Sequence, residues 1–159
     1  MRSLFTMVVL FYSLAGSGQT ETAIKQARAL FDDAPSGFKQ YTGRKKTGTD
    51  TLSSLYNSTI HIEGTTDDDI FKDSSGVMYS ANISDFVSRR EAQKINREWL
   101  GALEREFGRF KQLKGLNYGN RDIVSYNYRQ GCASISLDIV APEKRDNCLI
   151  IIHISCYPQ

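Results

Sequence analysis

Residues 38–43 read FKQYTG, and residues 110–115 read FKQLKG, seventy-two positions later. A segment with helical apolar periodicity precedes each copy, and strand-like segments follow each copy. Two such units predict an α+β domain of two layers, in which helices pack on one face of a continuous antiparallel sheet. We expect an internal duplication with repeats at 20–86 and 87–159 of a single domain over 19–159. The alternative is one α+β domain in which the short match arose by chance.

Each predicted unit begins with a helix. Residues 21–33 carry apolar side chains at helical spacing, and Pro35 with Gly37 is expected to end that helix. The second helix is predicted to begin at Ser88, because Ser88 and Glu91 have the spacing of a capping box. An apolar stripe follows, and Gly108 is a suitable terminator.

The remaining segments predict strands. The Phe-Lys-Gln segment of each copy is expected to form a short strand. Alternation or β-rich composition marks residues 52–63, 77–83, 110–116, 123–128, 133–139 and 149–157. The last two are expected to pair as an antiparallel hairpin across a charged connection. Residues 64–75 are acidic and polar, so we expect an exposed turn or a longer excursion there.

The N-terminus predicts export. Arg2 precedes an apolar run from Leu4 to Ala15, and small residues follow it, as in a secretory signal peptide at 1–18. The apolar core is too short for a transmembrane helix. We therefore expect a secreted or periplasmic protein with no transmembrane segment in the mature chain.

Charge and composition exclude several classes of function. Residues 1–18 contain one of the 20 basic residues and no acid, which leaves 19 basic against 18 acidic residues. A net charge near +1 argues against nucleic acid as a partner. The mature sequence contains no phosphate-binding loop, dinucleotide fingerprint or nucleophile elbow, so no cofactor is predicted. The two histidines, His61 and His153, lack the close spacing of zinc ligands, so no metal is predicted either.

Three cysteines suggest one disulfide. Cys132 lies near the start of one hairpin arm and Cys156 near the end of the other, so a Cys132–Cys156 bridge is expected in an oxidising compartment. Side-chain parity places the two on opposite faces unless a bulge at Gly131 realigns them. The alternative is that Cys148 and Cys156 are buried thiols that pack as small apolar residues.

These residues suggest three hypotheses for function. The first is a non-catalytic exported module that binds an unknown protein or envelope component, with Tyr126, Tyr128 and His153 on an exposed sheet face as contact residues. The second is a thiol-dependent or other small hydrolase that uses Cys132 and His153, with Asp138 or another acid. The third is a small-molecule carrier with a pocket between helices and sheet.

The signal peptide, the helix-led units and the two Phe-Lys-Gln-x-x-Gly segments resemble small exported proteins of uncharacterised function from Bacteroidetes-like Gram-negative bacteria. This resemblance implies a periplasmic or secreted α+β domain, and it carries over no catalytic residues. The doubled layout also resembles secretion-chaperone folds. Those chaperones are typically cytosolic, so the signal peptide argues against that function here.

Overall fold

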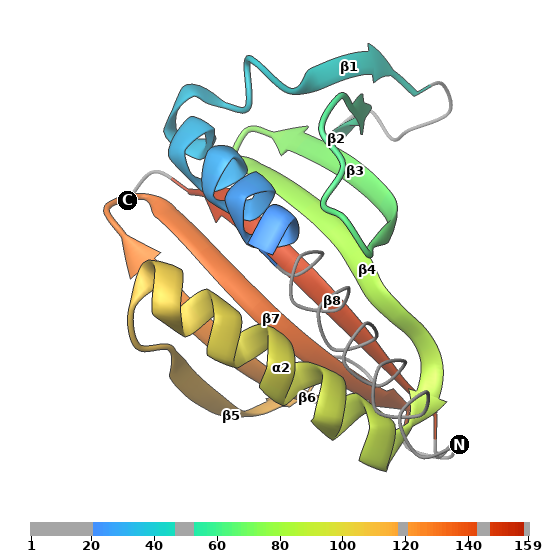
Figure 1. Ribbon diagram of the computed structural model, residues 1–159. Helices are drawn as coiled ribbons and strands as arrows, with labels where there is room; N and C mark the ends of the chain where they lie inside the picture. Colours follow the sequence, from blue (N-terminus) through green and yellow to red (C-terminus); the bar gives the residue numbers. More distant parts are fainter. Residues whose placement is uncertain (1–20, 47–52, 118–120, 143–146, 158–159) are drawn as a thin grey trace, which may run out of the picture.

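A computed structural model of the chain describes residues 21–46, 53–117, 121–142 and 147–157 (Figure 1). The described residues form an α+β protein with one eight-stranded antiparallel sheet and two helices. The predicted signal peptide at 1–18 lies outside the described residues.

Both helices agree with the sequence prediction. The first described helix covers residues 21–33 and leads into the 3-10 turn η1 (Ala34–Ser36), where Gly37 adopts a left-handed φ of 79°. The second helix, α2 (Arg89–Phe107), is capped by Ser88, whose hydroxyl accepts a hydrogen bond from the Glu91 amide at 3.3 Å. Both ends of α2 are therefore set by the local signals expected from the sequence.

The eight strands fall into two groups of four. Their bounds are β1 (Thr42–Lys45), β2 (Ser53–Ser58), β3 (Thr66–Asp73), β4 (Val77–Ser88), β5 (Lys111–Asn117), β6 (Arg121–Gln130), β7 (Ala133–Pro142) and β8 (Asn147–Cys156). Their order in the sheet is β1-β2-β3-β4-β8-β7-β6-β5, and every neighbouring pair is antiparallel. Each group is a meander that follows one helix, and the two groups meet at the central pair β4 and β8.

Two local predictions are corrected by the structure. Residues 64–75 were expected to form an exposed turn or a longer excursion, but β3 lies there and pairs on both sides, with β2 and β4. Three successive aspartates are poor strand formers, and the ladder on each side overrides that preference. The Phe-Lys-Gln segment of the first hexapeptide was expected to form a short strand, but Phe38 has a φ of 55° and β1 begins only at Thr42.

One face of the sheet, here called the Tyr128 face, holds the core. A row of paired residues crosses six strands on it: Tyr56, Ile70, Tyr79, Ile154, Ile135 and Tyr128. The four middle side chains of this row are fully buried. On β8, burial alternates along the strand, so Cys148, Ile150 and Ile152 belong to the same face. This alternation is the period-2 pattern of a sheet with one core-facing side.

Aromatic rings join the helices to this core. The Phe31 ring of the first helix lies 5.1 Å from the Phe107 ring of α2, and both rings lie about 6 Å from Tyr128, at 6.0 and 5.9 Å. Phe110 contacts Tyr128 as well, with ring centroids 5.8 Å apart. Arg28 places its guanidinium 4.9 Å from the Phe107 ring centroid. The two helices therefore contact each other and the sheet through one aromatic cluster.

The opposite face, here called the His153 face, carries the alternate residues of the same strands. His153 is paired with Ser80 of β4 on one side and with Ser136 of β7 on the other. Its side chain is 23% exposed. The two faces thus separate an apolar core from a surface that is largely polar at its centre.

Candidate functional site

A continuous row of polar side chains crosses the His153 face. Strand register places one residue from each of seven strands in this row: Asn57, Asp69, Ser80, His153, Ser136, Asn127 and Lys111. The two end residues are exposed, and the five between them are half-buried. Six spacings of about 4.8 Å between neighbouring strands give the row a length of roughly 29 Å.

Ser125, Asp138 and His153 form a hydrogen-bonded and charged group beside this row. The Ser125 hydroxyl donates to Oδ1 of Asp138 at 2.6 Å, and the other carboxylate oxygen, Oδ2, lies 3.6 Å from Nε2 of His153. Ser125 is buried, with 4% of its surface exposed. The carboxylate is therefore held in place on one side by a buried hydroxyl, and it faces the imidazole on the other.

His153 sits in an environment that favours the neutral ring. Burial lowers the pKa of His153 below its usual value, and the nearby Asp138 carboxylate opposes that shift. Nδ1 of His153 is buried and has no hydrogen-bond partner in the part of the chain that the structure describes. An imidazolium would have to leave one N–H unpaired there, which adds to the cost of protonation.

Apolar side chains flank the polar row. Leu55, Phe71 and Met78 are paired across β2, β3 and β4 on the same face, and Phe71 is 37% exposed. Near the opposite edge of the sheet, Leu113 of β5 is paired with Ser125 and is 43% exposed. The His153 face therefore combines a polar centre with partly exposed apolar groups toward both edges.

The three predicted contact residues do not share one face. Tyr126 and Tyr128 are paired with Leu137 and Ile135, so both belong to the Tyr128 face, whereas His153 belongs to the other. Tyr128 packs in the aromatic cluster described above. The sequence showed only that these tyrosines alternate with other residues, and alternation does not identify which face of the sheet holds the core.

The predicted Cys132–Cys156 disulfide is confirmed, with the two sulfur atoms 2.14 Å apart. Gln130 pairs with Ala133, so Gly131 and Cys132 are the two central residues of the β6–β7 turn. Gly131 has a φ of 62°, as the first position of a type II′ turn requires. Cys132 is thus a turn residue, and the parity of a strand does not govern where its side chain points. Cys148 is a buried free thiol.

The Cys132 and His153 pair of the hydrolase hypothesis is not brought together. The Cys132 sulfur is bonded to Cys156, and Ala133, the strand partner of Cys156, lies on the Tyr128 face. His153 is on the other face, next to Asp138. In this bonded state Cys132 offers no thiolate, so the arrangement does not form a nucleophile–base pair.

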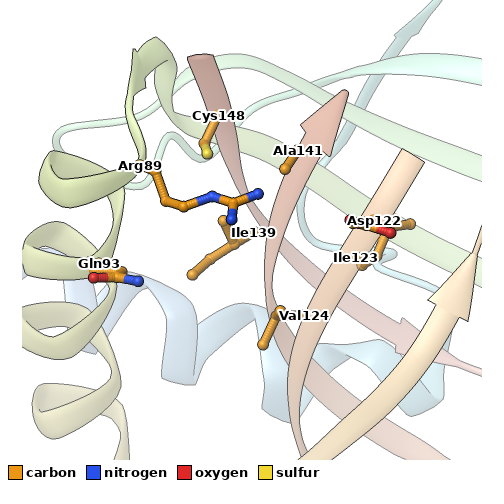
Figure 2. Close-up of a pocket in the computed structure, with 8 residues that line it drawn as sticks. All are labelled: Arg89, Gln93, Asp122, Ile123, Val124, Ile139, Ala141 and Cys148. Atoms are coloured by element: carbon orange, nitrogen blue, oxygen red, sulfur yellow. The ribbon is translucent and has the colours of Figure 1, made fainter. Parts of the chain in front are cut away.

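A pocket lies between the start of α2 and the strands of the second meander (Figure 2). Its volume is about 330 Å³. It is lined by Arg89, Gln93, Asp122, Ile123, Val124, Ile139, Ala141 and Cys148. Arg89 and Asp122 supply opposite charges to this one pocket. The sequence does not indicate this combination, because the two residues are far apart along the chain.

Within the residues that the structure describes, no group of three or more His, Cys, Asp or Glu side chains has a geometry that could hold a metal ion. None of the helices in the described ranges is long and apolar enough to cross a membrane.

Comparison of the chain with protein-family models, curated proteins and solved structures gave no match.

Proposed function

We propose that this protein is an exported, non-catalytic module that binds a protein or envelope component through the His153 face. The observation that carries the proposal is the polar row across seven strands, with partly exposed Phe71 and Leu113 on the same face. Polar groups at fixed spacing give specificity, and apolar groups beside them provide burial energy on binding.

The dimensions of this face suit a protein partner. The row is roughly 29 Å long. A standard protein–protein interface buries about 800 Å² on each partner, which corresponds to a patch roughly 28 Å across. A rigid sheet also loses little conformational entropy on binding, because its side chains are already fixed by their cross-strand neighbours.

The packing of the helices supports the choice of face. Phe31 and Phe107 come from different helices, and both contact Tyr128. We infer that both helices cover the Tyr128 face and leave the His153 face to a partner. Under this inference, Tyr126 and Tyr128 support the sheet from the core side, and only His153 of the three predicted residues contacts the partner.

An internal duplication accounts for the layout of both halves. The row on the Tyr128 face reads Tyr56, Ile70 and Tyr79 in one half, and Tyr128, Ile135 and Ile154 in the other. Phe38 and Phe110, the first residues of the two hexapeptides, are both buried and both precede the edge strand of their meander. We propose that repeats 20–86 and 87–159 arose from one helix-plus-meander unit, joined through β4 and β8.

Export is supported by covalent chemistry as well as by the N-terminal pattern. The Cys132–Cys156 bridge is of a kind that persists in oxidising compartments and is rare where glutathione keeps thiols reduced. The proposal places the mature protein in the periplasm or outside the cell.

The test uses the exported protein as bait in an envelope extract, followed by titration of each purified captured protein. The variants are Phe71→Arg and Leu113→Arg, which place a charge at partly exposed positions of the His153 face. The matched control is Phe86→Arg, at a phenylalanine that is 64% exposed and lies within the second register shift of β4, between Ser84 and Val87. We expect the two face variants to weaken binding by roughly tenfold or more, and the control to leave it unchanged.

One result would refute the assignment. If every captured protein binds the face variants as tightly as it binds the unaltered protein, the His153 face is not the contact surface. Circular dichroism of each variant shows whether its fold is retained, so that lost binding is not mistaken for lost structure.

A further inference from the structure

We propose a second binding site in the α2 pocket, for a small zwitterion that has an apolar body, one carboxylate and one ammonium group. This site is separate from the His153 face, and its argument does not depend on the function proposed above. It rests on the pocket, its apolar floor and its two opposite charges.

The floor of the pocket is apolar and formed mainly by the Tyr128 face. Ile139 of β7 pairs with Val124 of β6 and with Ile150 of β8, which places it on that face. Cys148 and Ala141 are buried, with 2% and 8% of their surfaces exposed. A hydrocarbon segment would therefore contact aliphatic carbon and a thiol, neither of which requires a strong hydrogen bond.

Opposite charges line two sides of the pocket. Figure 2 shows the Arg89 side chain extending from α2 over the strands, while Asp122 comes from β6 on the far side. Among the residues that the structure describes, no ion pair joins Arg89 to Asp122, and neither has another salt-bridge partner there. A ligand with one charge of each sign would satisfy both groups.

The backbone of α2 sets the orientation of the ligand. Arg89 is the first residue of this 19-residue helix, so this end of the pocket lies near the positive end of the helix dipole, which favours a negatively charged ligand group there. Ser88 accepts a hydrogen bond from the Glu91 amide, which satisfies one of the amide groups of the first turn. The carboxylate is therefore assigned to the Arg89 side and the ammonium to Asp122.

The presence of Asp122 decides against a simple anion. A fatty-acid-like carboxylate would gain the contact with Arg89 but would bring a second negative charge into the same pocket. A simple amine would gain Asp122 and meet the positive charge of Arg89. Only the zwitterion gains on both sides, and 330 Å³ is at the lower end of the range of ligand pockets, which suits a molecule of amino-acid size.

The experiment is a titration followed by NMR, with the full exported protein labelled with nitrogen-15. Two zwitterions distinguish the possible sources of this chemistry: L-leucine, an α-amino acid, and 6-aminohexanoate, whose two charges lie at the ends of the chain. Hexanoate and hexylamine are the matched controls, because each keeps the hydrocarbon body and one of the two charges.

We expect one of the zwitterions to produce saturable shifts at the amides of Ile139 and Ala141. Hexanoate and hexylamine should each bind the pocket roughly tenfold or more weakly than the zwitterion, since each lacks one of its two charge-assisted contacts. Arg89→Gln should reduce the affinity for the zwitterion to that for hexylamine, and Asp122→Asn should reduce it to that for hexanoate. Arg90→Gln, one residue further along α2 and outside the lining, is the control variant and should bind as the unaltered protein does.

Three results would overturn the proposal. The first is the absence of saturable shifts in the pocket with either zwitterion at millimolar concentration. The second is hexanoate or hexylamine binding as tightly as the zwitterion. The third is an Arg90→Gln effect equal to that of Arg89→Gln. Failure of the pocket proposal would not affect the proposal for the His153 face, because the test of that face uses different variants and a protein partner.

Discussion

Gly131 is the residue at which backbone conformation most directly positions a functional group. Its φ of 62° allows the two-residue β6–β7 turn, and the next residue is the bridged Cys132. A Cβ at this position would meet no atom within 4 Å, so a substitution tests the backbone alone.

We predict that Gly131→Ala lowers the free energy of unfolding by about 1 kcal/mol, because an L-residue is strained at positive φ. Denaturant titration measures the effect, and the slope of the free energy of unfolding against denaturant concentration should be unchanged. The matched control is Gly101→Ala within α2, where alanine is the better helix former and stability should rise by up to about 1 kcal/mol. Shifts of the same sign for both variants would contradict this account of the turn.

His153 should make stability depend on pH. Its folded-state pKa lies below the ordinary 6.5, so the folded protein binds fewer protons than the unfolded chain in the interval between the two values. The contribution of neutral His153 to the free energy of unfolding is therefore fully present above pH 6.5, and it decreases as the pH falls below that value. The groups facing the ring are Ser80 from β4 and Ser136 and Asp138 from β7, of which the Asp138 carboxylate partly offsets the lowering of the His153 pKa.

The measurement is urea unfolding of the unaltered protein and of His153→Gln between about pH 7.5 and pH 5. The variant should lose less stability than the unaltered protein over this interval. Parallel curves would show that His153 titrates alike in the folded and unfolded states.

At the scale of elements, α2 offers a direct test of its own start signal. Ser88→Ala removes the hydroxyl that accepts from the Glu91 amide, so we expect a loss of about 1 kcal/mol in the free energy of unfolding. Ser88→Asn retains a capping acceptor and should stay close to the unaltered protein. Equal losses for alanine and asparagine would mean that the cap does not stabilise the helix.

Elements with strong local signals were predictable from sequence. Proline and glycine mark the end of helix 21–33, a capping serine marks the start of α2, and a glycine marks its end. The β7–β8 hairpin follows from alternation. β3 was missed because its stability comes from ladders on both sides, which no local pattern displays. The disulfide was predictable in outline, but its turn geometry depends on the φ of Gly131.

At the scale of the whole molecule, sequence periodicity predicted the alternation of each strand but not which face of the sheet holds the core. Tyr126 and His153 were assigned to one surface for that reason, and they belong to opposite faces. The α2 pocket was expected only as a general possibility. The charges of this pocket could not be predicted, because Arg89 and Asp122 line the same pocket only once α2 packs against the second meander.

The disulfide should stabilise the assembled sheet. Cys132 and Cys156 are 24 positions apart, and closing a loop of that length in the unfolded chain corresponds to about 3.5 kcal/mol in the entropy account of cross-links. We expect reduction of the unaltered protein to lower its free energy of unfolding by roughly that amount. A Cys132→Ala/Cys156→Ala variant should be similarly weakened and indifferent to reductant. A reductant effect that persists in this variant would point to some other thiol.

The central position of β4 and β8 has a consequence for the order in which the chain is made. Synthesis and secretion both deliver a polypeptide from its amino end, so the twelve residues of β4 appear well before their neighbour β8. Throughout that interval the nascent first meander presents a long, unsatisfied edge, the template on which strands of other molecules aggregate. A holdase that shields residues 77–88 until 147–156 arrive would therefore be expected to raise the yield of this protein more than one acting at either outer margin of the sheet.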